Sequence, residues 1–358
     1  MLSGLTAKQT AITAAGSFLG AGYISGQELW QFFARHGADG FLGFLLSISL
    51  ICIIMVLVMS SSLGKRSLSV DIVMFGKRNA AFRNLFFLTE LSFLFCVASV
   101  MSAGTGALLH QIMGCHRILG GAVLLSILII MCIRGLDTVV SYFSLIIPAL
   151  VLITFFITWS SVSSDTASVS FIFSTSTTYA GSWIFSALTF SSYNLFNALP
   201  SLAIIGGNAA GKKSVLAGCV AACFILFSTG ICILFVLLHN NSETAEIPML
   251  YAASCISPIL EHIYGVLLFA AMTGSAISCT YGIVVNLTQR YALAQHNPRK
   301  TIAAVCVISF LGGQIGFTKL IATVYPAFGV AGAFFLLVYI CRIIYVHISR
   351  SRASRIAA

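Results

Sequence analysis

Residues 11–33, AITAAGSFLGAGYISGQELWQFF, decide the fold, because they are long enough to cross a membrane but poorly suited to one continuous helix. Four glycines stand in this stretch: Gly16, Gly20, Gly22 and Gly26. Each interior glycine costs a helix on the order of 1 kcal/mol relative to alanine. An acidic side chain at membrane depth, here Glu28, is costly and usually functional. We therefore predict a discontinuous helix whose unwound backbone forms half of a substrate site.

Close packing between helices is the alternative interpretation of these glycines. Small residues four apart, such as Gly16 and Gly20, let two membrane helices approach closely without any ligand. Packing alone does not require a buried acid, so the nearby Glu28 favours the ligand-binding interpretation.

The composition is that of an all-α polytopic membrane protein. Hydrophobic residues make up 59% of the chain and charged residues 8%, with a mean hydropathy of +1.02. A membrane span needs roughly 20 apolar residues. Ten windows meet this requirement: about 8–33, 39–62, 83–111, 118–134, 138–160, 182–206, 214–239, 257–287, 301–318 and 321–348. We expect one transmembrane domain over residues 1–358, with halves at about 1–160 and 182–348.

The net charge of +10 does not indicate a nucleic acid partner, because the basic residues follow the membrane topology. With the N-terminus in the cytoplasm, 16 of the 19 Lys and Arg residues fall in cytoplasmic segments, and only Arg35, Arg117 and Lys319 lie outside. This asymmetry is the positive-inside pattern. We therefore expect a multi-pass protein of the plasma membrane, surrounded by lipid, with both termini in the cytoplasm.

No catalytic residues are predicted. The 11 cysteines form no CxxC pair, and the seven histidines are scattered. We find no nucleophile beside a base and no metal-ligand spacing. We therefore expect neither an enzyme nor a resident cofactor other than a bound Na⁺.

The sixth predicted span, within residues 183–207, is the second unusual one. Tyr193, Asn194 and Asn197 gather near its centre, and Pro200 follows and removes a backbone donor. We predict a second broken helix, with a proline kink and internally bonded polar groups as the alternative. Breaks in spans one and six of ten would divide the chain into two five-helix halves related by an inverted repeat.

Several other segments carry weaker signals. Glu90 in the third span is a candidate for proton coupling, although pairing with Arg83 or Arg134 explains it equally well. We expect an amphipathic surface helix within residues 63–82, an extracellular loop at 160–181 and a short lid helix around 248–255.

Three stretches carry a resemblance to a known family: GSFLGAGYISGQELWQFF at 16–33, SSYNLFNALPSL at 191–202 and EIPML at 246–250. They resemble the YkvI-type family of bacterial membrane proteins, which is similar to the amino acid–polyamine–cation superfamily of LeuT-fold transporters. The resemblance implies ten core helices, alternating access, and transport of a small amino acid or related solute with Na⁺ or H⁺.

The resemblance also implies a sodium site. Gly16, Gly20 and Gly22 match the GxxxGxG spacing of sodium-coupled relatives, which would bring the carbonyls of Gly16 and Leu19 to the ion. The eighth-span segment at 269–275, FAAMTGS, would add three residues: Ala270 through its carbonyl and Thr273 and Ser275 through their hydroxyls. Glycine occupies position 274, where relatives carry the second hydroxyl, so sodium coupling stays open.

The predicted substrate site lies between the first and sixth spans. Its members are Gly20, Ala21, Gly22, Ser25, Gly26, Gln27, Glu28, Tyr193, Asn194 and Asn197. The resemblance implies that N–H groups around Ala21 and Gly22 meet a substrate carboxylate. Glu28 would bind a substrate amine, carry a coupling proton or form part of the outer gate.

The predicted function is a secondary active transporter of an amino acid or related amine. A solute-sensing receptor without transport and a channel are the alternatives. The chain shows no large soluble output domain, which weakens the sensor, and no repeated pore loop, which weakens the channel.

Overall fold

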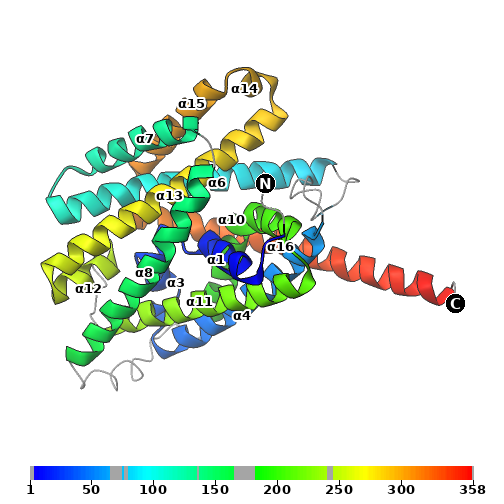
Figure 1. Ribbon diagram of the computed structural model, residues 1–358, viewed down its shortest axis with the longest axis horizontal. Helices are drawn as coiled ribbons and strands as arrows, with labels where there is room; N and C mark the ends of the chain where they lie inside the picture. The colour runs from blue at the N-terminus through cyan, green and yellow to red at the C-terminus, as the bar shows by residue number, and fades with distance from the viewer. Residues whose placement is uncertain are drawn as a thin grey trace.

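The computed structural model describes residues 4–64, 75, 80–134, 137–164, 182–239 and 245–356 (Figure 1). The described chain is helical apart from turns and one isolated β-bridge between Leu5 and Ala209. The prediction of an all-α polytopic fold is confirmed.

Helices cover each of the ten predicted spans. The first span comprises α1 (Ala7–Phe18), α2 (Ala21–Ile24) and α3 (Gln27–Phe32), followed by the short helix η1 (Ala34–His36). The remaining helices are α4 (Ala38–Ser62), α6 (Ala80–Met113), α7 (Arg117–Arg134), α8 (Asp137–Ser164), α10 (Ser182–Asn208), α11 (Lys212–His239), α12 (Pro248–Ile256), α13 (Pro258–Arg290), α14 (Ala292–His296), α15 (Pro298–Gly313) and α16 (Phe317–Ile356).

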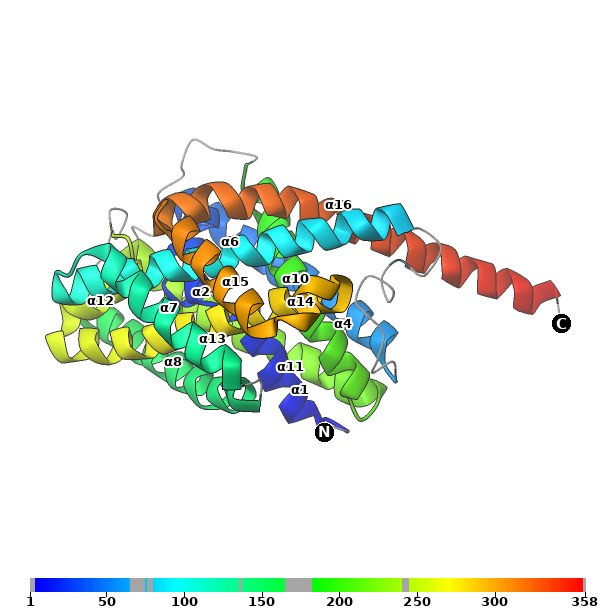
Figure 2. The same cartoon turned by 90° about the horizontal axis from the view of Figure 1, so that it is seen from above.

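Within the described residues, five helices are long and apolar enough to cross a membrane. They are α4, α6, α11, most of α13 and the part of α16 up to Ile344. Helices α7 and α8 contain shorter apolar stretches, Arg117–Met131 and Ile146–Ser161, which are not among these five. The C-terminal part of α16 projects beyond the rest of the bundle, as Figures 1 and 2 show.

The first span is interrupted twice. Helix α1 starts with a capping box between Thr6 and Gln9 and ends at Phe18. The N–H of Gly20 then donates to the carbonyl of Phe18 at 2.7 Å, which replaces the helical bond to the carbonyl four residues back. After α2, Gly26 has a φ of 82°, a left-handed conformation that glycine adopts without steric cost. The predicted discontinuity therefore lies at Leu19–Gly20 and again at Ser25–Gly26.

The predicted break in the sixth span is wrong, because α10 continues through Pro200 to Asn208. A proline inside a helix removes one backbone bond but need not end the helix. Two of the polar side chains near its centre bond within α10: Ser191 donates to the carbonyl of Ala187 at 2.7 Å, and Asn194 to that of Phe190 at 3.1 Å. Tyr193 instead donates to Glu28 of α3. The alternative prediction, a continuous helix with polar groups bonded inside it, therefore describes α10 better than a break does.

Two groups of helices meet at the first span. Helix α1 packs against α10 and α11, and α10 also packs against α4 and α16. On the other side, α6 packs against α7, α13 and α15. Figure 1 shows α1 lying among α8, α10 and α11, so the first span is central to the fold.

A short helix, α12 (Pro248–Ile256), lies where the lid helix is predicted, and its role as a lid stays a prediction. The N–H of Met249 in α12 donates to the carbonyl of Ser25 at 3.1 Å, so the lid bonds directly to the second interruption. Glu246 before α12 pairs with Arg117 at the start of α7, with 2.9 Å between Nη1 and Oε1. The predicted amphipathic helix at 63–82 and loop at 160–181 fall largely outside the described residues.

Candidate substrate site

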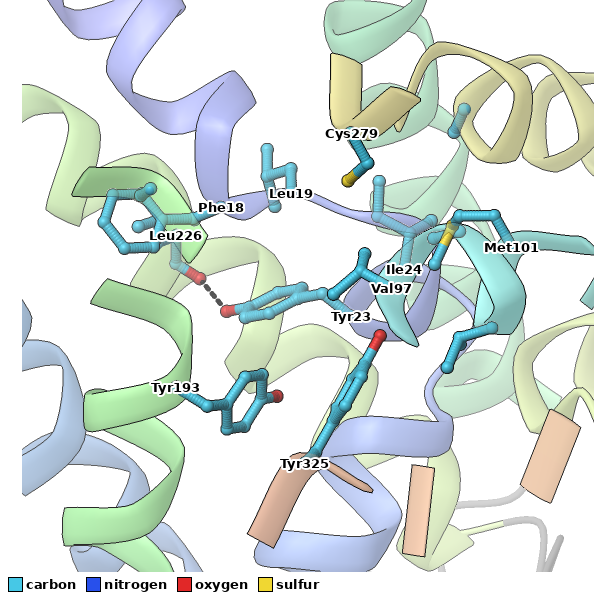
Figure 3. Close-up of a cluster of buried hydrophobic side chains, with 14 of the residues drawn as sticks. Phe18, Leu19, Tyr23, Ile24, Val97, Met101, Tyr193, Leu226, Cys279 and Tyr325 are labelled. Carbon is cyan, nitrogen blue, oxygen red and sulfur yellow. Dashed lines mark hydrogen bonds between the residues drawn. The ribbon is translucent and has the colours of Figure 1, made fainter. Parts of the chain in front are cut away.

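The candidate site surrounds the first interruption of the first span. Figure 3 shows Leu19, Tyr23 and Ile24 enclosed by side chains from five other helices: Val97 and Met101 of α6, Tyr193 of α10, Leu226 of α11, Cys279 of α13 and Tyr325 of α16. Tyr23 anchors α2 because its hydroxyl donates to the carbonyl of Leu226 at 2.7 Å. All of the first span from Ala21 to Leu29 is buried.

Glu28 lies inside this enclosure. Its side chain is 5% exposed, and its Oε2 accepts a hydrogen bond from the hydroxyl of Tyr193 at 2.5 Å. The carboxyl group also reaches back over α2: a Cβ built on Gly22 would lie 2.7 Å from Cδ of Glu28. Glycine at position 22 therefore provides the space that this carboxyl group fills.

No cation balances Glu28 within the described parts of the chain. The ion pairs found there do not include it, and no buried Lys or Arg occurs among the described residues. An ionised carboxylate without a counter-charge is costly in a low-dielectric medium. The negative charge of Glu28 is therefore neutralised either by a proton on its carboxyl group or by a cationic ligand.

Hydrogen bonds fix the second interruption rather than leaving it free for a ligand. The hydroxyl of Tyr264 in α13 donates to the carbonyl of Ile24 at 2.6 Å, and Met249 bonds the carbonyl of Ser25. The hydroxyl of Ser25 donates to the carbonyl of Gly22 at 3.0 Å and accepts from the N–H of Gln27. Ser25 therefore shapes the turn.

The remaining predicted substrate residues differ in their surroundings. Gln27 is buried, and its Oε1 has no hydrogen-bond partner in the described structure. Asn194 is bonded within α10, whereas Asn197 on the same helix is half-buried. Gly26 packs against the lid, because a Cβ there would lie 3.1 Å from Met249. The residues brought together around the enclosure are therefore Glu28, Tyr193 and the backbone at 20–22.

The predicted sodium residues do not all face the first interruption. Ser275 in α13 does, since its Oγ lies 4.0 Å from a Cβ built on Gly20. Helix α13 is continuous, so Thr273 is turned about 200° away from Ser275. The Thr273 hydroxyl donates to the carbonyl of Phe269 in its own helix at 2.8 Å. Thr273 and Ser275 therefore lie on different faces of α13, and their joint role in a sodium site stays a prediction.

The other sodium residues and Glu90 are placed as follows. Gly16 packs against α8, because a Cβ there would lie 2.6 Å from Ile147. Leu19 is buried at the interruption, and Ala270 is half-buried one turn before Thr273. Glu90 is buried in α6, and its role in proton coupling stays a prediction.

Sequence reasoning missed two aromatic residues of the site. The ring of Tyr325 lies 4.7 Å from that of Tyr193, between centroids, and its hydroxyl points toward α2 in Figure 3. Tyr264 supplies the bond to Ile24 described above. The one available signal for Tyr325 was its position before Pro326 in the last span.

The chain is similar to curated membrane proteins over nearly its whole length. It is 25% identical over 353 residues to the uncharacterized membrane protein YkvI of Bacillus subtilis (strain 168), which covers 94% of this chain and 96% of YkvI. No protein-family profile matches the chain. The resemblance to the YkvI-type family is confirmed by this similarity.

Solved transporter structures share the fold. MhsT in complex with L-phenylalanine superposes with a TM-score of 0.74 at 15% identity, covering 92% of this chain and 88% of MhsT. A Na⁺-coupled sialic acid symporter in a substrate-bound outward-open state gives a TM-score of 0.66 at 12% identity, covering 94% of this chain and 78% of the symporter. At such identities the likeness shows the fold alone, which is the LeuT-type transporter fold.

Proposed function

Because this chain is a relative of the YkvI-type membrane proteins and has the LeuT-type fold, we propose that it is a secondary active transporter. It would move a small organic solute, an amino acid or a related amine, by alternating access. The observation that carries the proposal is the enclosure at the first interruption, where the Glu28 carboxyl group, bonded by Tyr193, lies against Gly22 of α2.

The residues of the enclosure have distinct roles in this proposal. Glu28 binds the positive charge of the solute, and Tyr193 orients the Glu28 carboxyl group through their hydrogen bond. The backbone at 20–22 and the ring of Tyr325 bound the rest of the site. Binding would favour one arrangement of the first span relative to α6 and α13, which is how a ligand shifts a conformational equilibrium.

Coupling to H⁺ has better geometric support than coupling to Na⁺. Glu28 is a buried acid without a cationic partner in the described structure, which suits a group that takes up and releases a proton. A sodium ion at the first interruption would have the hydroxyl of Ser275 as a ligand but not that of Thr273. Sodium coupling, as in the symporter named above, is the second candidate.

The test is solute flux into proteoliposomes that contain the purified protein. A transporter gives saturable uptake that depends on a proton or sodium gradient. Binding of a solute without flux would indicate a sensor and refute the proposal. Flux that does not saturate and ignores both gradients would indicate a channel.

A further inference from the structure

We infer that the substrate is an organic amine without a carboxylate group, and that its ammonium group takes the place of a proton on Glu28. This inference rests on the proposed function, because it names the substrate class of the same site. Three features of the described residues support it: the position of the Glu28 carboxyl group, the charge balance of the interior, and the aromatic rings around the site.

The first feature is the place that the Glu28 carboxyl group occupies. It lies against Gly22, where a Cβ would come within 2.7 Å of its Cδ, and it accepts the hydroxyl of Tyr193. The chain thus supplies its own carboxyl group to α2, two residues after the first interruption. A substrate carboxylate at the same place would have to displace Glu28 or lie beside a second carboxyl group, and like charges at such a distance repel strongly in a low-dielectric site.

The second feature is the charge of the interior. The buried ionisable side chains that the structure describes include Glu28 and Glu90, but no Lys or Arg. Arg and Lys side chains form the strongest hydrogen bonds to a desolvated carboxylate. The described interior can therefore neutralise the ammonium group of a substrate but has no cationic side chain for a carboxylate.

The third feature is the set of aromatic rings around Tyr193, whose hydroxyl bonds the Glu28 carboxyl group. Tyr193 lies 5.4 Å from Phe32, 5.5 Å from Phe190 and 4.7 Å from Tyr325 between ring centroids. Aromatic faces attract ammonium groups by cation–π interaction, most strongly where water is excluded. A carboxyl group beside such rings can bind an organic cation through its charge and through cation–π contacts.

One carboxyl group cannot hold a proton and an ammonium group at the same time, so the two compete. The titratable groups that face Glu28 are the phenols of Tyr23 on α2, Tyr193 on α10 and Tyr325 on α16. On η1, the imidazole of His36 bonds Ser186 instead. Amine binding should therefore weaken as the pH falls, and transport should exchange a proton for an amine.

The experiment compares each amine with the amino acid that differs from it by one carboxylate. Suitable pairs are isobutylamine and valine, tyramine and tyrosine, and putrescine and ornithine. Each compound is tested on the wild-type protein for a rise in melting temperature and for uptake into proteoliposomes, at mildly acid and mildly alkaline pH. Ligand that binds the folded state raises the melting temperature by mass action.

We expect at least one amine to bind at least tenfold more tightly than its partner amino acid, and more tightly at the higher pH. Glu28→Gln should abolish this binding, whereas Glu261→Gln, which removes a partly exposed acid near the start of α13, should not. The preference of the wild-type protein decides the inference even if Glu28→Gln does not fold.

The failures of the inference and of the proposed function can be told apart. If an amino acid binds and is transported as well as its amine, the inference is overturned while the transporter proposal stands. A panel without any response also overturns the inference. The transporter proposal fails only if a wider mixture of solutes shows no gradient-dependent flux.

Discussion

Gly22→Ala tests whether the Glu28 carboxyl group lies where the structure places it. The new Cβ would lie 2.7 Å from Cδ of Glu28 and 2.9 Å from Cγ, so the side chain must move and lose its bond to Tyr193. Without a ligand Glu28 carries a proton, and a lost hydrogen bond between neutral groups costs about 0.5–1.5 kcal/mol. Overpacking adds about 1–3 kcal/mol, and alanine in a helix returns about 1 kcal/mol relative to glycine. The free energy of unfolding should fall by about 0.5–3.5 kcal/mol.

Gly20→Ala is the matched control. Gly20 has φ −71° and ψ 170°, which alanine adopts freely, and the nearest atoms to a new Cβ lie 4.0 Å away. Its effect on stability should be neutral or stabilising by up to about 1 kcal/mol. The assay is thermal unfolding of the purified variants in one detergent, where Gly22→Ala should melt several degrees below Gly20→Ala.

A double variant shows whether Glu28 causes the loss. In a Glu28→Ala background the clash is gone, so Gly22→Ala should cost little, and the two substitutions should be strongly non-additive. Equal melting temperatures for Gly22→Ala and Gly20→Ala would refute the placement of the carboxyl group. Additive effects of the two changes would refute its contact with Gly22.

Two further predictions follow from single helices. If Na⁺ raises the melting temperature, Ser275→Ala should remove that rise and Thr273→Ala should retain it. The reason is that Ser275 faces the first interruption, whereas Thr273 lies on another face of α13. Loss of the rise in Thr273→Ala alone would contradict this geometry. In the turn between α3 and α4, burial and then the charge of Arg35 lower the pKa of His36. The unfolded chain then binds the proton more readily, so stability should be complete above the ordinary histidine pKa of about 6.5 and fall below it. His36→Gln, which can still bond Ser186, should flatten this part of a melting-temperature profile against pH, and an unchanged profile would contradict the assignment.

The sequence was sufficient to predict the helical membrane fold and the interruption of the first span, because glycine acts locally on the backbone. It was not sufficient to distinguish a break from a tolerated proline in α10. Whether the helix continues through Pro200 depends on the hydrogen bonds that the surrounding polar side chains form. Ser191 and Asn194 each bond a carbonyl one turn back in α10. A cluster of polar residues is therefore weaker evidence for a break than a cluster of glycines.

Site residues on distant spans were the hardest to predict. Helical periodicity already separates Thr273 from Ser275 by about 200°, so their placement on different faces follows from spacing alone once α13 is known to be continuous. Tyr325 is different, because its approach to Tyr193 depends on how α16 packs on α10. Packing of this kind leaves no local pattern in the chain.

If the chain is the transporter proposed above, the hydrogen bonds of the first span indicate which contacts alternating access would have to break. At its N-terminal end, Leu5 is bonded on both sides: its N–H donates to Asn208 at 2.9 Å, and its carbonyl accepts from Ala210 at 3.0 Å and from Ser214 at 2.8 Å. These bonds join the span to α10 and α11, the helices against which α1 also packs, so the three should move together.

At its other end, the same span is bonded to the lid and to α13. Tyr264 holds the carbonyl of Ile24, Met249 holds that of Ser25, and the Arg117–Glu246 pair joins the lid to α7. The two carbonyl bonds are buried, whereas the ion pair is partly exposed and worth at most about 1 kcal/mol. Opening on the predicted outer side therefore requires two buried bonds to break, while the N-terminal bonds to α10 and α11 can persist. Because Glu28 lies one turn beyond Ile24 and Ser25, a ligand that displaces its carboxyl group would act directly on the segment that these two bonds restrain.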